Sequence, residues 1–333
     1  MTVLVTGASG FVGSAITRAL IERGADVAVL VRESSNPANF ESLKVHIRHG
    51  DLRDKASLAR ACKGCDTLFH VAADYRLWTR DSRELYASNV DGTRNLMEMA
   101  LETGIDRIVY TSSVATLGTG IDGALGDETS AVTVNDMIGH YKRSKFLAER
   151  VIDDLVATQN LPAVIVNPST PVGPRDVKPT PTGRLVRDAA AGRMPAYIDT
   201  GLNIAHVDDV AAGHILALER GAIGRRYILG GENLTLREIL HIIASICGRA
   251  PPKTRLPRRL VYPFAYASQA WAWLSHGPEP QATVDGLKMA KKHMFFDSSR
   301  AFEELGYQSR PAKDALADAI TWFAAHEPSN SQQ

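Results

Sequence analysis

The chain has 333 residues, a formal net charge of +1 and 44% hydrophobic residues. A chain of this length buries about three quarters of its unfolded surface, which is enough for one large domain or two fused lobes. The balanced charge gives no reason to expect a nucleic acid partner. No apolar run approaches the ~20 residues that span a bilayer. Three cysteines and a first motif at residue 3 predict a cytoplasmic protein without a secretory signal.

A glycine motif opens the chain. An apolar run over residues 3–5 is followed by Gly7, Gly10 and Gly13 and then by a helical pattern that ends at Gly24. The first glycine allows a sharp turn, the second lets backbone N–H groups approach a pyrophosphate, and the third lets the helix pack closely on the strand. Phosphates favour such a helix N-terminus. The motif therefore predicts a dinucleotide site.

The first half of the chain alternates short apolar runs with helical patterns, which indicates a parallel sheet covered on both faces. The predicted fold class is α/β, a Rossmann doubly wound parallel sheet with a smaller mixed α/β substrate lobe. The strands are expected at residues 26–31, 45–48, 67–73, 107–113 and 163–166, and long helical patterns at about 83–102 and 302–323.

The predicted domains follow from this alternation. Residues 1–170 form the dinucleotide-binding domain, and residues 203–220 return to it. Residues 171–202 and 221–326 form the substrate lobe, and residues 327–333 form a disordered tail.

The end of the second strand bears on the choice of cofactor. Arginine at this place accommodates a 2′-phosphate, whereas an acidic residue holds a ribose 2′-hydroxyl. Arg32 comes first off the strand, and the hydroxyls of Ser34 and Ser35 suit a phosphate. The order favours NADP, with NAD held by Glu33 as the alternative. Asp51, after the third strand, is placed to meet the adenine amine.

The sharpest catalytic pattern is Tyr141 with Lys145. The two residues are four apart on one helix face, so an ammonium can approach a phenol and lower its pKa from about 10. Ser113 ends a strand at the edge where open α/β sheets bind ligands. Together these residues predict a proton-transfer site beside the dinucleotide.

Two further patterns are interpreted as structural. Cys62 and Cys65 form a C-x-x-C, but no second pair of ligands completes a zinc site, so both are predicted to be packed thiols. His206 with Asp208 precedes an acidic helix start and is also interpreted as structural. No metal site is predicted.

Residues 6–13, 110–113, 141–145 and 167–168 together resemble the extended short-chain dehydrogenase/reductase superfamily, the NAD-dependent epimerases and dehydratases. Residues 31–33, the Gly64-Cys65 pair, residues 69–72 and the stretch 167–169 resemble its dihydroflavonol 4-reductase-like branch, which includes bacterial hopanoid-associated sugar epimerases. The resemblance covers nearly the whole chain.

The resemblance implies a role for each matching residue. Tyr141 would be the general acid/base, Lys145 would hold the nicotinamide ribose and lower the Tyr141 pKa, and Ser113 would hydrogen-bond the reacting oxygen. Asn89 would support the site from behind, and the chain would form a homodimer. Besides Tyr141 and Lys145, the cofactor-binding residues would be Gly7, Gly10, Phe11, Val12, Gly13, Arg32, Asp51, Leu52, Ala72, Ala73, Asn167, Pro168 and Ser169.

The substrate side is less defined. Asp74, Tyr75, Trp78 and Pro171 are expected to line the pocket. Residues 251–276 begin with basic residues and continue with aromatic ones, a pattern that fits a lid helix, a grip on an anionic substrate, or peripheral contact with a membrane through residues 255–275.

Three functions are compatible with these patterns. The NADP-type Arg32 favours an oxidoreductase that moves a hydride between the nicotinamide and a carbinol or ketone carbon of a small organic substrate. A sugar-nucleotide epimerase or dehydratase is the alternative, with Arg255, Arg258 and Arg259 on the substrate diphosphate. A dinucleotide-sensing regulator without turnover is the third, and it is the hardest to reconcile with an intact Ser113, Tyr141 and Lys145.

Overall fold

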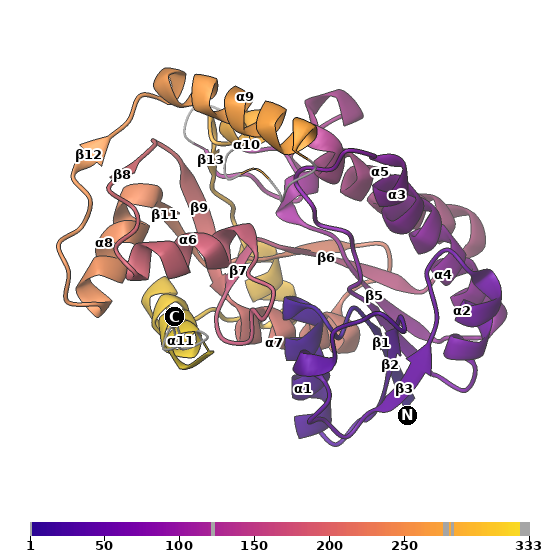
Figure 1. The fold of residues 1–333 in the computed structure, drawn as a ribbon. Helices are drawn as coiled ribbons and strands as arrows, with labels where there is room; N and C mark the ends of the chain where they lie inside the picture. The colour runs from indigo at the N-terminus through magenta and orange to yellow at the C-terminus, as the bar shows by residue number, and fades with distance from the viewer. Residues whose placement is uncertain (1, 121–123, 276–279, 281–282, 327–333) are drawn as a thin grey trace.

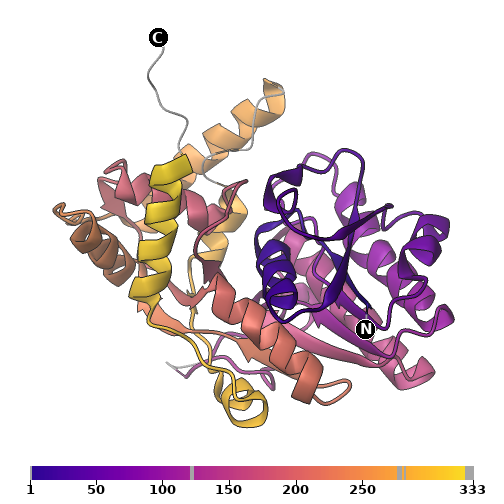
Figure 2. The same cartoon turned by 90° about the horizontal axis from the view of Figure 1, so that it is seen from below.

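The structure is a computed structural model that describes residues 2–120, 124–275, 280 and 283–326 (Figure 1). The tail predicted at residues 327–333 lies outside the described residues. A seven-stranded sheet with helices on both faces makes up one part of the molecule, and a smaller mixed lobe packs beside it (Figure 2).

The large sheet is parallel throughout, in the order β10-β6-β5-β4-β1-β2-β3. Its strands are β1 (Thr2–Thr6), β2 (Asp26–Val31), β3 (His46–His49), β4 (Thr67–His70), β5 (Arg107–Thr111), β6 (Ala163–Pro168) and β10 (Arg226–Leu229). The strand order reverses between β1 and β4, and ligands bind at such a switch point. This arrangement confirms the predicted doubly wound fold.

Helices cover both faces of this sheet. On one face lie α1 (Phe11–Glu22) and α7 (Val207–Arg220), and on the other α2 (Lys55–Cys62), α4 (Gly92–Glu102) and α5 (Gly139–Gln159). Successive side chains of a strand point to opposite faces. Val3 and Val5 of β1 accordingly pack in the core under α1 and α7, and Leu4 packs in the core under α2, α4 and α5.

The helical pattern predicted at residues 83–102 is present, with one irregularity. It begins as α3 (Arg83–Tyr86), passes through a π-helical turn (Ala87–Asp91) and continues as α4. Single π turns inside a helix are frequent at functional sites. This turn carries Asn89, which is buried.

The lobe contains a four-stranded sheet made of β7 (Thr170–Val172), β9 (Gly201–His206), β11 (Glu232–Thr235) and β13 (His293–Met294). A second small sheet pairs β8 (Ala196–Tyr197) with β12 (Thr254–Arg255). The lobe helices are α6 (Pro181–Ala190), α8 (Leu236–Ile246), α9 (Arg258–Leu274), α10 (Val284–Met289) and α11 (Ala312–His326). Val186, Ile243 and Leu316 share one core there.

Two boundaries differ from the sequence prediction. Residues 226–229, assigned to the lobe, form β10 and pair with β6 in the large sheet. The helix predicted over residues 302–323 is broken, because Gly306 adopts a left-handed conformation (φ +73°) and Pro311 comes just before α11. A short π-helical turn (Ala301–Leu305) precedes the break.

Within the described residues, every helix is too short or too polar to cross a membrane. In the same part of the chain, no three His, Cys, Asp or Glu side chains gather as ligands for a metal ion. Cys62 and Cys65 are buried free thiols, and burial raises the pKa of Cys62 to about 12. Both therefore pack as unreactive side chains.

Candidate active site

The glycine turn between β1 and α1 has no room for side chains at its two critical positions. A Cβ on Gly13 would lie 2.1 Å from the Gly7 carbonyl oxygen, and a Cβ on Gly7 would lie 2.7 Å from the Ala72 nitrogen. Gly7 also has a φ of +77°, which L side chains rarely adopt. Gly10 is the N-cap of α1, which begins at Phe11 and Val12. The backbone is therefore open to close approach by a phosphate group.

The Thr6 hydroxyl joins this turn to the end of β4. It accepts hydrogen bonds from the backbone N–H groups of Val71 and Ala72, both at 3.1 Å, and therefore donates to His70 Nδ1 at 2.9 Å. His70 Nε2 then donates to Thr93 Oγ1 at 3.0 Å. Burial, with the Lys145 charge as a second cause, lowers the pKa of His70 to about 3. This histidine is a neutral structural link.

Charged side chains gather at the ends of β2 and β3. Arg32 is exposed, and its backbone N–H donates to Ser35 Oγ at 3.0 Å. The Asp51 carboxylate accepts from Arg53 Nε and Nη2 at 2.9 and 2.8 Å. Arg53, with a smaller effect of Arg32, lowers the pKa of Asp51 to about 2. The edge predicted to hold the adenosine end thus carries two guanidinium groups and one ionised carboxylate, with Glu33 exposed nearby in the chain.

Tyr141 and Ser113 are brought together from different elements. Tyr141 lies in the first turn of α5, and Ser113 follows β5 and caps a short 3-10 turn (Val114–Thr116). The Ser113 side chain lies near the phenol. Burial raises the pKa of Tyr141 above its usual value of about 10, and hydrogen bonding by the Ser113 side chain opposes that shift. The phenol is therefore protonated at neutral pH.

Lys145 is buried one helical turn after Tyr141. Its Nζ donates to the Thr111 carbonyl oxygen at 2.8 Å and to the Tyr110 hydroxyl at 3.2 Å, and it lies 4.8 Å from the centre of the Tyr110 ring. Burial lowers the pKa of Lys145 to about 8, while Glu149 raises it. The expected contact with the phenol is thus replaced by contacts to the end of β5, where the last carbonyl offers a strong acceptor.

Asn89 connects three segments near this site. Its Oδ1 accepts from the backbone N–H of Asp74 at 2.7 Å, and its Nδ2 donates to the Asp74 carbonyl oxygen at 2.8 Å. The same Nδ2 donates to Ser144 Oγ at 3.0 Å. The loop after β4 is therefore tied to α5 through the π-helical turn.

A buried carboxylate lies beneath Ser113. Glu149 Oε2 accepts from Thr116 Oγ1 at 2.9 Å, from Asn167 Nδ2 at 3.1 Å and from Ser112 Oγ. Its Oε1 pairs with Arg226 Nε of β10 at 3.2 Å. The Asn167 amide also donates to the Ser113 carbonyl oxygen at 3.0 Å. This network connects β5, β6, β10 and α5.

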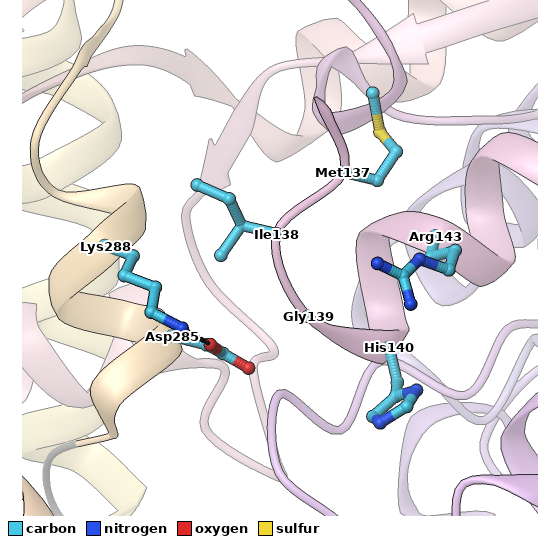
Figure 3. Close-up of a pocket in the computed structure, with 7 residues that line it drawn as sticks. All are labelled: Met137, Ile138, Gly139, His140, Arg143, Asp285 and Lys288. Carbon is cyan, nitrogen blue, oxygen red and sulfur yellow. Dashed lines mark hydrogen bonds and ion pairs between the residues drawn. The ribbon is translucent and has the colours of Figure 1, made fainter. Parts of the chain in front are cut away.

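A cavity of about 290 Å³ lies between the first turn of α5 and α10 (Figure 3). Its lining residues are Met137, Ile138, Gly139, His140, Arg143, Asp285 and Lys288. Asp285 forms an ion pair with Lys288 at 3.2 Å and faces the turn at Gly139 (Figure 3). Its lining includes His140 and Arg143, on either side of Tyr141 in the chain, and it lies where α5 of the domain meets α10 of the lobe.

The sequence profile of the NAD dependent epimerase/dehydratase family matches residues 3–230. The chain belongs to this family. It is 46% identical, over 97% of its length and 94% of the relative, to a Synechocystis sp. protein provisionally named dihydroflavonol 4-reductase. It is 35% identical, over 97% of its length and 98% of the relative, to sterol demethylase protein B of Methylococcus capsulatus. Among solved structures, the crystal structure of gox2253 superposes on this chain with a TM-score of 0.88, and the two sequences are 54% identical, with 98% of each chain covered.

Membership of the epimerase/dehydratase family confirms the resemblance and the enzyme class predicted from the sequence. The chain is an NAD(P)-dependent enzyme of the extended short-chain dehydrogenase type. The residues around its glycine turn and Tyr141 accordingly form the candidate active site of a member of this family.

The residues expected on the substrate side of this family member are spread over two segments. The Asp74 carboxylate forms an ion pair with Arg76, with 2.5 Å between Asp74 Oδ2 and Arg76 Nη2. Tyr75 is 38% exposed, and Trp78 is half-buried with the Arg80 guanidinium 5.9 Å from its ring centre. Pro171 lies in β7, paired with β9. The structure therefore groups Asp74, Tyr75 and Trp78 on one loop and places Pro171 on the lobe sheet.

Three residues of the site were missed by sequence reasoning. The Tyr110 hydroxyl accepts a hydrogen bond from the Lys145 ammonium. The Glu149 carboxylate accepts from Asn167, whose amide also bonds the Ser113 carbonyl oxygen. Arg53 forms an ion pair with Asp51. One sequence signal was available, because Glu149 follows Lys145 by four residues and so lies on the same buried face of α5. The partners of Tyr110 and Arg53 come from tertiary packing.

Proposed function

We propose that the protein is an NADP-dependent oxidoreductase that moves a hydride between the nicotinamide and a carbinol or ketone carbon of an organic substrate. Ser113, Tyr141 and Lys145 would carry the chemistry. The observation that supports this most directly is the half-buried phenol of Tyr141, whose pKa is raised by burial and lowered in part by hydrogen bonding from the Ser113 side chain. A phenol that stays protonated at neutral pH is ready to act as a general acid.

The residues present fit a dinucleotide. The two glycine positions that exclude a Cβ leave backbone for a pyrophosphate at the start of α1. In the described part of the chain, the buried atoms Asn167 Oδ1 and Ser169 Oγ have no hydrogen-bond partner. We propose that both face the nicotinamide end, next to Pro168, and that Leu52 and Ala73 line the adenosine and ribose sides. When bound, NADPH supplies the hydride.

The proton has a defined source in this proposal. Tyr141 donates its phenolic proton to the substrate oxygen as negative charge develops there, and the Ser113 hydroxyl orients that oxygen. The Lys145 ammonium, buried among Thr111 and Tyr110, adds positive charge that favours the resulting phenolate. In oxidation the same groups act in reverse, with Tyr141 accepting the proton.

NADP is preferred over NAD in this proposal because of the charge at the ends of β2 and β3. Arg32 is exposed there, and among the described residues its guanidinium forms no hydrogen bond or ion pair, whereas Asp51 is already neutralised by Arg53. Guanidinium groups bind phosphate oxygens in a bidentate fashion. Glu33, which would suit NAD, is also exposed and remains the competing residue.

The sugar-nucleotide epimerase alternative is supported by the family itself but less by the substrate side. Arg255 pairs with Asp199 at 2.7 Å, and Arg258 donates to the backbone carbonyl groups of Asp199 and Ala290. Two of the three arginines expected on a diphosphate are thus engaged elsewhere. A relative named for sterol demethylation instead supports an apolar substrate for the chain.

The proposed function is tested by NADPH oxidation with a panel of ketones and aldehydes. We expect Tyr141→Phe to abolish turnover while NADPH still binds, because only the phenolic oxygen is lost. Tyr227→Phe is the matched control, since its hydroxyl bonds Ala222 and Glu304 outside the site. Retained turnover in Tyr141→Phe would overturn the mechanism. Tightly held NAD released from the purified protein would instead identify an epimerase.

A further inference from the structure

Helix α9 presents an unusual outer surface. Six of its large apolar side chains are exposed, from 55% for Phe264 to 72% for Trp271. The six are Leu260, Phe264, Tyr266, Trp271, Trp273 and Leu274. Soluble proteins seldom expose large apolar side chains in such a contiguous group without a binding function. Figure 2 shows α9 projecting from the lobe.

The exposed residues lie on one side of the helix. With about 100° between successive residues, all ten exposed positions of α9 fall on the same half of its circumference. Besides the six large apolar residues, these are Arg259, Pro263, Ala267 and Ala270. The opposite half carries Ala265 and Ala272, which are buried. Ala265 packs with Val284 and Leu287 of α10. The helix therefore has an inner face that fixes it to the lobe and an outer apolar face.

The charged residues within this segment of the sequence are of one sign. Residues 251–274 contain Lys253, Arg255, Arg258 and Arg259 and no aspartate or glutamate, in a chain whose net charge is only +1. Lys253 and Arg259 are exposed. The cations come at the N-terminal end of α9, and the tryptophans come at its C-terminal end.

We propose that α9 docks this enzyme on the surface of an anionic lipid bilayer. Tryptophan and tyrosine favour the membrane interface, leucine and phenylalanine enter the acyl boundary, and lysine and arginine attract anionic headgroups. A helix that lies in the interface binds by its apolar face and does not span the membrane. A second copy of this chain is a weaker match, because it would bring a second group of cations against the first.

The docked helix packs on an element that lines the cavity at the start of α5. On its inner side α9 packs on α10, whose Asp285 and Lys288 line the cavity together with His140, the residue before Tyr141 (Figure 3). Arg80, from the loop that carries Trp78, donates to the Ala272 carbonyl oxygen at 2.7 Å. Membrane docking would thus present the cavity to an apolar carbinol or ketone dissolved in the bilayer. This last step rests on the proposed function, whereas the docking itself does not.

Vesicle flotation tests the docking without substrate or cofactor, so its result is independent of turnover. The probes are vesicles of phosphatidylcholine alone and of phosphatidylcholine mixed with phosphatidylglycerol. We expect the full chain to float with the mixed vesicles, and less so at high salt. The double variant Trp271→Ser with Trp273→Ser should lose about 100-fold in partition. The matched control is Ile223→Ser with Phe302→Ser, two residues 53% and 61% exposed outside α9, and it should float as the parent does.

Folding of each variant is checked by circular dichroism and thermal unfolding. Absence of flotation by the parent chain with both vesicle types would overturn the proposal, as would an equal loss in the control. An oligomer that dissociates in the tryptophan variant, without vesicle binding by the parent, would show that α9 is a subunit interface and would also overturn it.

Discussion

The Asn167 amide donates to the Glu149 carboxylate at 3.1 Å, and both residues are completely buried. The same amide holds the Ser113 carbonyl oxygen, and the same carboxylate pairs with Arg226. The position of the predicted catalytic serine is thus fixed by a charge that no solvent reaches. The first prediction follows from that arrangement.

Replacement of Glu149 by glutamine should lower the free energy of unfolding by about 1–3 kcal/mol, because it removes the carboxylate that accepts from Ser112, Thr116 and Asn167 and leaves Asp153 as the carboxylate partner of Arg226. The new amide would also point N–H groups at existing donors. Chemical denaturation measures the change. Glu219→Gln is the control, since Glu219 pairs with Arg23 at the surface, and it should cost less than about 1 kcal/mol. Equal losses would contradict a special role of the buried pair.

The glycine turn predicts a graded response to alanine. Gly13→Ala places a Cβ 2.1 Å from the Gly7 carbonyl oxygen, so the turn must shift and NADPH binding should be lost. Gly10→Ala places its Cβ 3.2 Å from the same oxygen, and a displacement of a few tenths of an ångström accommodates it. Cofactor titration of both variants checks the order. Tighter binding by Gly13→Ala than by Gly10→Ala would contradict the geometry.

Arg32→Ala should weaken NADPH binding by about 10- to 100-fold, the value of one charge-assisted hydrogen-bonded contact to a phosphate, and should leave NADH nearly unchanged. Fluorescence titration with both nucleotides measures the ratio. Glu33→Gln is the paired variant, since it should affect NADH only if the chain is built for NAD. Equal losses of NADPH and NADH in Arg32→Ala would show that this residue does not contact the 2′-phosphate.

Acid should destabilise the protein through its buried histidines. Burial lowers the pKa of His214 to about 4, so between pH 6.5 and 4 the unfolded chain binds a proton there that the native protein does not. The free energy of unfolding therefore decreases as the pH is lowered, by about 2 kcal/mol from this residue between pH 7 and pH 5. His70 acts in the same direction.

Thermal unfolding at several pH values checks this prediction, and His214→Gln should flatten the curve. The matched control is His241→Gln, because both histidines contact the carbonyl group four residues earlier at 2.7 Å, but His241 is exposed. An unchanged pH dependence in His214→Gln would rule out this residue as the cause.

The large sheet and the glycine turn were predictable because their signals are local. A strand, three glycines and a helix follow one another within about twenty residues, and Tyr141 and Lys145 share one helix face. The boundary of the lobe was not predictable in the same way. Whether residues 226–229 join β6 or a lobe strand depends on pairing between segments some sixty residues apart.

The partners of charged side chains were the other limit. Lys145 was expected against the phenol, but the nearest strong acceptors are a carbonyl group and a hydroxyl group at the end of β5. The sequence does not indicate which acceptor lies closest to the Lys145 ammonium, because that depends on the angle between α5 and the sheet. The ion pair between Arg53 and Asp51 was likewise not predicted from the sequence.

Asn89 satisfies both the N–H and the C=O of Asp74, as a neighbouring strand would. One side chain thus replaces a stretch of sheet at the point where β4 has ended. Insertions and substitutions after Asp74 leave this anchor, and with it the cofactor half of the molecule, in place. The loop that follows can therefore change in length and sequence while the backbone at the end of β4 keeps its partner.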